Sequence, residues 1–547
     1  MGLKEVFTDS TLARYTKAMR EAPREIIFSR KMLLSAALYA MSGVPITWDQ
    51  GSSSVMTNLP GFQDHFNIAS GRDAATIREF VSLVYVGCGV GAALSFFVND
   101  RIGRLWSFRL YMVIWVLGQL IATFAPNLGT LYAARIVCGL GIGPLTVLGT
   151  MAIVEIAPTA MRGLLASWFS VIMLLSLFVS TFTVYGVYEH MAPSRLQYQV
   201  VWFAPCLFVA VCIGCSFFLC ESPRWLFLVD RAEEGVRTIE ELRGLPRDHP
   251  AVHAEITEIR MSIAQEKGSF GDGSNGAGIL SILREAFTVP ANLRRIQQSI
   301  VAYGLAQLSG ANSVTSYLVP ILSLMGIGGD TSRSLFLSGM YSMAKFFFCL
   351  IASFFFIDAL GRRKSLFVGI ITQMLSDIYL GVYIKYNQQG DVSAAASQGA
   401  IAAIFIHGFG YAVGLLILPY VFGGELWPNR LRSFGSALSQ TFHWLFYYGV
   451  NAAMPNILSN MDNWGAFIFF AGWCFIALVY VFLMVPEIAG LSMEEMDAIF
   501  SGPWFTAWRT PAKKHAVVDA VSASPSRDSN LDEPDKLKAL SEERAIP

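Results

Sequence analysis

The sequence of residues 129–154, GTLYAARIVCGLGIGPLTVLGTMAIV, decides the class of fold. This stretch is apolar almost throughout and carries one charged residue, Arg135. A helix of about 20 apolar residues crosses the hydrocarbon core of a bilayer, and it satisfies its own backbone hydrogen bonds there. The stretch therefore predicts a transmembrane helix.

Similar stretches continue on both sides. The predicted spans are 32–52, 79–99, 106–125, 129–154, 164–187, 200–220, 298–324, 334–357, 365–386, 397–423, 433–459 and 464–485. Charged residues make up 15% of the 547 residues, against about 25% in a soluble chain, and the mean hydropathy is +0.48. We therefore predict an all-α polytopic membrane protein with about twelve transmembrane helices.

The charged residues exclude some functions and set the orientation. Forty basic residues balance forty acidic ones, so no overall basic field favours nucleic acid. The first 31 residues are polar and basic, which disfavours a cleavable signal peptide. Most Lys and Arg fall in the tails and in the loops on one side, which predicts that both termini are cytosolic.

The polar segments suggest how the chain is divided. We expect a cytosolic N-tail (1–31), a first six-helix bundle (32–220), a cytosolic linker (221–297), a second six-helix bundle (298–485) and a cytosolic C-tail (486–547). In the linker, Val252, Ile256, Ile259 and Ile263 recur at helical spacing, which predicts short amphipathic helices. A Gly/Ser-rich patch from Gly268 to Gly278 predicts a flexible connection, and the tail beyond about residue 520 has the composition of a disordered segment.

Three pairs of motifs repeat in the same order along the chain. The motif DRIGR at 100–104 recurs as DALGRR at 358–363. The pair Glu155 and Arg162 recurs as Glu425 and Arg432, and ESPR at 221–224 corresponds to Pro486-Glu487. The chain is therefore predicted to contain two six-helix halves in parallel repeat, which is typical of an alternating-access transporter with its site between the halves.

With these motifs the sequence resembles the sugar porter family of the major facilitator superfamily from residue 32 to 500. The resemblance also includes WDQG at 48–51, AAR at 133–135 followed by GLGIG at 139–143, QLSGAN at 307–312, and PE at 486–487 followed by GLSMEEMD at 490–497. It implies the major facilitator fold, a cavity for the substrate and a rocker-type cycle.

The resemblance assigns the charged cytosolic motifs to a gate. The expected cluster comprises Asp100, Arg101, Arg104, Glu155, Arg162, Glu221 and Arg224 of the first half, and Asp358, Arg362, Arg363, Glu425, Arg432 and Glu487 of the second. Each exposed ion pair contributes about 0–1 kcal/mol, which suits a latch that must open. Positive-inside anchoring is the alternative, and it explains the arginines but not the matched acids.

Two charges inside the first half are candidates for proton coupling. In family members with an acid at the position of Asp49, that acid can carry the coupling proton while the arginine at the position of Arg135 modulates its pKa. A neighbouring cation favours the carboxylate and burial favours the acid, so a conformational change can load or release a proton. A structural ion pair or a passive carrier is the alternative.

Further residues match substrate-binding positions of the family. Gln307, Asn312 and Tyr317 fall where relatives bind sugar hydroxyls, Tyr420 where relatives place a tryptophan, and Trp444 can form a second aromatic wall. Departures from the family pattern are Ser316, Ser170 and His443, where relatives carry a tyrosine, a glutamine and an asparagine. His443 can help to bind an anion or relay protons, or it can simply be packed and neutral. Missing amides disfavour a plain glucose carrier.

Lys345 is the most informative departure, because relatives have an asparagine near this position. A cation in the cavity suits a substrate carboxylate, and a lysine here resembles fungal quinate-type and sugar-acid porters. The alternative is a buried ion pair with Asp377, because Lys345 lies 13 residues before Asp358 and Asp377 lies 13 after Lys364.

We therefore expect a multi-pass protein, in the plasma membrane and monomeric, that acts as a secondary active transporter. It is expected to couple protons to uptake of a sugar, polyol or sugar acid of the quinate or galacturonate type. A facilitative carrier of neutral hexose or pentose, or a non-transporting sugar sensor, is the alternative. No nucleophile–base pair, metal-ligand set or Walker motif occurs in the spans, so we expect no enzyme, no metal and no cofactor other than the proton.

Overall fold

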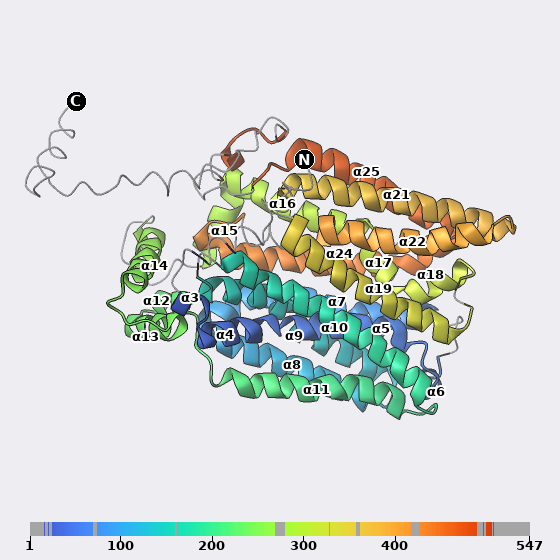
Figure 1. Ribbon diagram of the computed structural model, residues 1–547, viewed down its shortest axis with the longest axis horizontal. Coiled ribbons are helices and arrows are strands. Elements are labelled where there is room, and N and C mark those ends of the chain that lie inside the picture. The colour runs from blue at the N-terminus through green and yellow to red at the C-terminus, as the bar shows by residue number, and fades with distance from the viewer. Residues whose placement is uncertain are drawn as a thin grey trace, which may run out of the picture.

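The computed structural model describes residues 16, 20, 24–68, 74–158, 161–268, 279–327, 329–356, 361–416, 426–488, 496, 499–505 and 507. Throughout these residues the regular elements are helices, with no strand. Figure 1 shows two bundles side by side, one formed by the first half of the chain and one by the second. A smaller group of helices lies at one end of both bundles.

The first bundle contains α4 (Arg30–Ala40), α5 (Gly43–Met56), α6 (Pro60–Phe66), α7 (Ala74–Ile102), α8 (Arg104–Thr123), α9 (Leu128–Ile156), α10 (Arg162–His190) and α11 (Leu196–Ser216), and the short α3 (Arg24–Ile27) precedes it. The second contains α16 (Pro290–Leu308), α17 (Ala311–Ser316), α18 (Leu318–Leu324), α19 (Thr331–Ile351) with the π-helix η1 (Ala352–Phe356), α21 (Arg362–Gln389), α22 (Ala394–Tyr411) with the π-helix η2 (Ala412–Leu416), η3 (Asn429–Leu431), α24 (Arg432–Asn460) and α25 (Trp464–Met484).

The predicted spans are found, but the first helix of each half is broken. The span 32–52 is divided into α4 and α5 at Met41–Ser42, and the span 298–324 is divided into α16, α17 and α18 at Ser309–Gly310 and at Tyr317. Nine helices of the described residues are long and apolar enough to cross a membrane. The two broken helices and the more polar α24 complete twelve. Irregular backbone at membrane depth is tolerated where it lines a cavity.

Close helix contacts explain the glycine runs. A Cβ atom added to Gly139 would collide with the carbonyl oxygen of Val84, and one added to Gly143 would collide with that of Cys88. The glycines therefore allow α9 to pack tightly on α7, as small residues do between membrane helices. Between the halves, α7 packs along α24 and α10 packs along α19.

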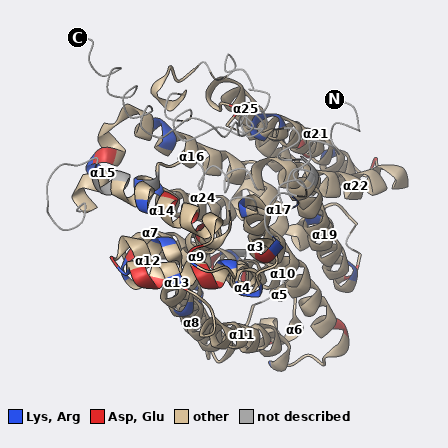
Figure 2. Ribbon diagram, turned by 60° about the vertical axis from the view of Figure 1, so that its left-hand side comes forward, with Lys and Arg blue, Asp and Glu red and all other residues tan. Residues whose placement is uncertain are grey.

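The linker forms α12 (Pro223–Leu228), α13 (Ala232–Arg243), α14 (Pro250–Gly268) and α15 (Ile279–Thr288). Val252, Ile256 and Ile263 of α14 are buried against α12 and α13. Arg243 joins this group to the bundle, because its guanidinium pairs with Glu255 at 2.6 Å and donates to the carbonyl of Ile156 at 3.0 Å. Charged residues gather at this end of the molecule (Figure 2). The expected flexible segment 269–278 and the tail beyond 520 lie outside the described residues.

Candidate functional site

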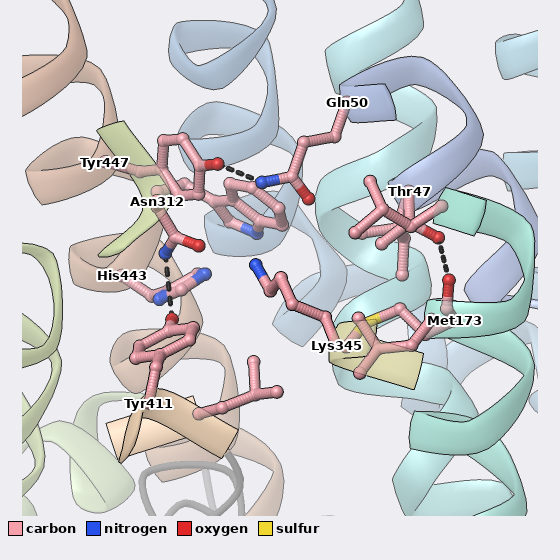
Figure 3. A pocket seen from close by; sticks show the side chains of 13 residues that line it. Thr47, Gln50, Met173, Asn312, Lys345, Tyr411, His443 and Tyr447 are labelled. Carbon is pink, nitrogen blue, oxygen red and sulfur yellow. Dashed lines mark hydrogen bonds between the residues drawn. The ribbon is translucent and has the colours of Figure 1, made fainter. Parts of the chain in front are cut away.

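A pocket lies between the two halves at the broken helices (Figure 3). It is lined by Ile46, Thr47 and Gln50 of α5, Met173, Leu174 and Leu177 of α10, Asn312 of α17, Lys345 of α19, Tyr411 and Leu416 of α22 and η2, and His443, Trp444 and Tyr447 of α24. Apolar residues of α10 form one side, and polar residues of the second half form the other. Such a mixture of apolar walls and a few directed polar groups is typical of a small-molecule site.

A hydrogen-bonded chain fixes the polar wall. The Asn312 amide donates to the Gln307 side-chain oxygen and to the Tyr411 hydroxyl, both at 2.9 Å. Gln307 Nε2 lies 3.2 Å from Nδ1 of His443. Gln307 does not line the pocket; it holds Asn312 and His443 from behind. These buried amides are therefore oriented before any substrate arrives.

Lys345 enters the pocket from α19 and is 2% exposed. Its ammonium donates to Thr315 Oγ1 at 3.0 Å and lies 5.7 and 5.4 Å from the ring centroids of Tyr341 and Tyr411. Among the described residues no carboxylate forms an ion pair with Lys345. The alternative of a Lys345–Asp377 pair is therefore wrong, because the Asp377 carboxylate faces His407 at 3.4 Å instead.

Aromatic rings close the remaining side. The Trp444 ring stacks on Tyr85 of α7, with centroids 5.8 Å apart and planes at 8°. Its indole N–H donates to Thr146 Oγ1 at 3.3 Å. The Tyr447 hydroxyl accepts from the Gln50 amide across the interface between the halves. Helices α24, α7, α9 and α5 are thus held together by side chains of the pocket wall.

Three other residues predicted to bind substrate do not line this pocket. Tyr317 donates to the carbonyl of Asn451 at 3.1 Å, Ser316 is buried in α17, and Ser170 is partly buried near the start of α10. Tyr420 lies outside the described residues. Of the residues predicted to bind substrate, four therefore line the pocket: Asn312, Lys345, His443 and Trp444.

Four polar lining residues were not predicted as substrate ligands: Thr47, Gln50, Tyr411 and Tyr447. Gln50 directly follows Asp49 in the motif WDQG, so the neighbouring residue of that motif was a usable signal. Tyr411 ends α22 where it continues as a π-helix. No spacing rule in the sequence marks such a π-helix, so the face on which Tyr411 lies could not be assigned.

Asp49 and Arg135 form a buried ion pair inside the first half. Asp49 Oδ1 lies 2.5 Å from Arg135 Nη1, and both side chains are 2% exposed. The Gln119 amide also donates to Asp49 Oδ1 at 3.3 Å, and the Arg135 Nε donates to the carbonyl of Phe80 at 3.0 Å. Asp49 does not line the pocket, but its chain neighbour Gln50 does. The pair therefore lies directly behind the pocket wall.

The cytosolic cluster of the first half is assembled around Arg104. Its guanidinium pairs with Glu155 at 2.8 Å and with Asp100 at 2.9 Å. The Glu221 carboxylate accepts the backbone N–H groups of Arg104 and Leu105, and burial raises the pKa of Glu221. Arg101 and Arg162 are exposed, and Arg224 lies at the start of α12.

The second half repeats one part of this arrangement. The Glu487 carboxylate accepts the backbone N–H groups of Arg362 and Arg363 at 3.0 and 3.1 Å. Arg432 begins α24, and Asp358 and Glu425 lie outside the described residues. The bonds to Glu221 and Glu487 each stay within one half, so a latch between the halves remains a prediction.

Comparison with known proteins gives a consistent result. The profile of the family "Sugar (and other) transporter" matches residues 35–500. A probable quinate permease of Aspergillus niger is 27% identical over 523 residues, which cover 93% of this chain and 94% of the relative. The quinate permease of Emericella nidulans is 27% identical over 489 residues, covering 88% and 90%.

Solved structures share the fold. The proton:xylose symporter XylE bound to 6-bromo-6-deoxy-D-glucose superposes with a TM-score of 0.72 at 18% identity, covering 86% of this chain and 99% of that one. The partially occluded inward-open XylE from E. coli gives 0.68 at 18% identity, covering 85% and 100%. These structures have the major facilitator fold.

Proposed function

The chain belongs to the sugar (and other) transporter family, so it is a transporter and not an enzyme, and from that premise we propose that it is a proton-coupled carrier of a carboxylated polyol of the quinate type. It works by alternating access between its two halves. The proposal also places the protein in the plasma membrane as a monomer, with both termini cytosolic and the proton as its coupling ion.

The observation that carries the proposal is the position of Lys345. Among the described residues, the buried Lys345 ammonium has a neutral hydroxyl as its hydrogen-bond acceptor and no carboxylate as a counter-charge, and burying a charge without one is costly. A substrate carboxylate in the pocket supplies that charge through a strong, charge-assisted bond. The polar side chains of Asn312, Tyr411 and Thr47 line the same pocket, so the hydroxyl groups of a bound polyol would lie against them. The names of the fungal relatives support the same class of substrate.

The Asp49–Arg135 pair supports proton coupling. In the geometry described, the Arg135 guanidinium forms an ion pair with the Asp49 carboxylate. If α5 and α9 separate during the cycle, the carboxylate loses its partner and accepts a proton from water that reaches it. Return of Arg135 then expels the proton. Because Gln50 lies beside Asp49 and contacts Tyr447 of the other half, closure around substrate is linked to this pair.

The breaks between α4 and α5 and between α16 and α17 support alternating access. Both halves begin with a helix that is interrupted at the depth of the pocket, and residues after the breaks line it. Discontinuous helices that place their residues around a central site are common in secondary transporters. Rocking of the halves would expose these residues to each side in turn.

Uptake by a transporter-deficient yeast tests the proposal. Labelled quinate, galacturonate, glucose and xylose are supplied with and without a protonophore. We expect quinate or galacturonate to accumulate and the protonophore to abolish the accumulation. Accumulation of glucose or xylose alone would favour the neutral-sugar carrier, and no uptake of any compound would favour a sensor.

The variant Lys345→Met tests substrate recognition. Losing one partner of a buried charge pair costs at least about 2 kcal/mol, so we expect the KM for quinate to rise by about 30-fold or more. Lys385→Met is the matched control, because Lys385 lies at the far end of α21 and contacts the Trp464 ring at 4.9 Å. An unchanged KM in Lys345→Met would contradict the carboxylate proposal.

A further inference from the structure

A second buried acid lies in the second half and has no role in the function described so far. Asp377 of α21 and His407 of α22 are both 0% exposed, and Asp377 Oδ1 lies 3.4 Å from His407 Nε2. Within the described part of the chain, neither carboxylate oxygen of Asp377 accepts a hydrogen bond. An ionised carboxylate in that setting is costly unless a nearby cation balances it, whereas a carboxyl and imidazole that share one proton are neutral without one.

Within the described residues, few other charges lie near the pair. Cys474 of α25 and Tyr341 of α19 are the titratable side chains close to Asp377, and Lys345 of α19 is close to His407. The side chains of all of these residues are buried. Lys345 is therefore the nearby cation, and it points into the pocket.

The repeat places Asp377 where the first half has its own charged site. Gly361 follows Gly103 by 258 residues, and both glycines precede the third long helix of their half. The same offset of 258 relates Asp377 of α21 to Gln119 of α8, and Gln119 donates to Asp49. The second half thus has an acid of its own at the level of the Asp49–Arg135 site.

The pair also lies directly behind the pocket. His407 precedes Tyr411 by four residues on α22, so the two side chains share a helix face. The Tyr411 hydroxyl accepts from Asn312, and its ring lies 5.4 Å from the Lys345 ammonium. A change of charge at Lys345 therefore changes the electrostatic potential at His407, which lies one helical turn from Tyr411.

We propose that Asp377 and His407 form a second proton-binding site, which is loaded when an anionic substrate binds at Lys345. The proposal rests on the proposed function for its substrate. With the pocket empty, the Lys345 ammonium and the Asp377 carboxylate leave the interior neutral overall. A bound carboxylate adds one negative charge, and one proton taken up by the Asp377–His407 pair removes it again.

The pair takes one proton from the outer aqueous side together with the anion, and it returns the proton to the cytosol when the anion leaves. No covalent bond to carbon or oxygen of the substrate changes. With a further proton on Asp49, two protons accompany one quinate anion, so one net positive charge enters per cycle. The transport is therefore electrogenic.

Current measurements on reconstituted full-length protein test this. We expect quinate to evoke an inward positive current in the wild type. In Asp377→Asn the pair cannot take up the extra proton, so labelled quinate still enters but the current disappears. Asp391→Asn, an exposed acid after α21, is the matched control and keeps the current. A current per quinate in Asp377→Asn equal to that of the wild type would overturn the proposal.

A second measurement needs no substrate. Infrared difference spectra between two pH values are expected to show the C=O band of a protonated carboxyl that Asp377→Asn removes and Asp391→Asn retains. Identical spectra in the wild type and in Asp377→Asn would overturn the site. If the wild type transports none of the acids while this band is present, the proposed function fails and the proton site stands. The pH dependence of the current in His407→Gln is expected to differ from the wild type, and an identical profile would exclude the imidazole.

Discussion

The two halves of the molecule are alike at their cytosolic ends and different at their centres. In the first half the central acid Asp49 is paired with Arg135 at 2.5 Å. In the second half the cation Lys345 bonds to the hydroxyl of Thr315, and the acid Asp377 faces His407 at 3.4 Å. Among the described residues, the central charges of the first half pair with each other, whereas Lys345 of the second half has no paired carboxylate and lines the pocket.

The cytosolic ends show what both halves retain. Gly103 and Gly361 have φ angles of +90° and +86°. The carboxylates of Glu221 and Glu487 accept hydrogen bonds from the backbone N–H groups that directly follow these two glycines. The shared feature is therefore a structural device that begins the third helix of each half. The repeat therefore preserves the scaffold, while the charged residues at the centres of the two halves have different roles.

Removing Arg135 is expected to have the largest effect. Arg135→Met leaves Asp49 buried without a cation, which lowers the free energy of unfolding by about 3–5 kcal/mol. Chemical denaturation in detergent measures it. Combining Arg135→Met with Asp49→Asn removes the unpaired charge and is expected to restore most of the stability. A double variant as unstable as Arg135→Met alone would show that Arg135 does not stabilise the protein through its pairing with Asp49.

The glycines at the cytosolic ends test the similarity of the halves. Gly103 and Gly361 adopt backbone angles that are essentially restricted to glycine, and an added Cβ would lie 2.6 and 2.7 Å from the carboxylate oxygens of Glu221 and Glu487. Gly103→Ala and Gly361→Ala are each expected to lower the free energy of unfolding by about 1–3 kcal/mol.

Gly214→Ala is the matched control, because it lies in a helix with open space around its Cβ position and is expected not to destabilise. Thermal unfolding of the three variants side by side provides the measurement. A large loss at Gly103 with none at Gly361 would break the proposed equivalence of the two ends.

The exposed pair between the first bundle and the linker is expected to have the smallest effect. The Lys31 ammonium lies 2.5 Å from Glu241 and both side chains are half exposed, so Lys31→Met changes the free energy of unfolding by about 0–1 kcal/mol. The hydrogen bond from Lys31 lowers the pKa of Glu241. The contribution is therefore present at neutral pH and is lost as the pH falls through that lowered pKa. The free energies of unfolding of the wild type and of Lys31→Met are measured at neutral and at acidic pH. The wild type is expected to lose the contribution of the pair at acidic pH, whereas Lys31→Met has no such contribution to lose.

The sequence predicted the scaffold better than the lining of the pocket. Long apolar runs and the repeated motifs are enough to predict twelve helices in two halves, because membrane insertion depends on composition. Lys345 and Asn312 were found as pocket residues through their departure from, or match to, a family pattern. Tyr411 and the partner of Asp377 were missed, because the π-helix and the rotation of α21 against α22 depend on packing that no local spacing encodes.

The central claim is that Asp49 of the first half carries one coupling proton while Lys345 of the second half binds the substrate carboxylate. The most direct test is the accumulation ratio of quinate in vesicles that have a pH gradient and no membrane potential, compared between wild type and Asp49→Asn. With two coupled protons, the equilibrium accumulation ratio of quinate equals the square of the proton concentration ratio. Losing one coupled proton reduces the accumulation ratio to the square root of its wild-type value. We predict that reduction, with quinate exchange in the absence of a gradient retained. A variant that reaches the wild-type ratio would contradict the account.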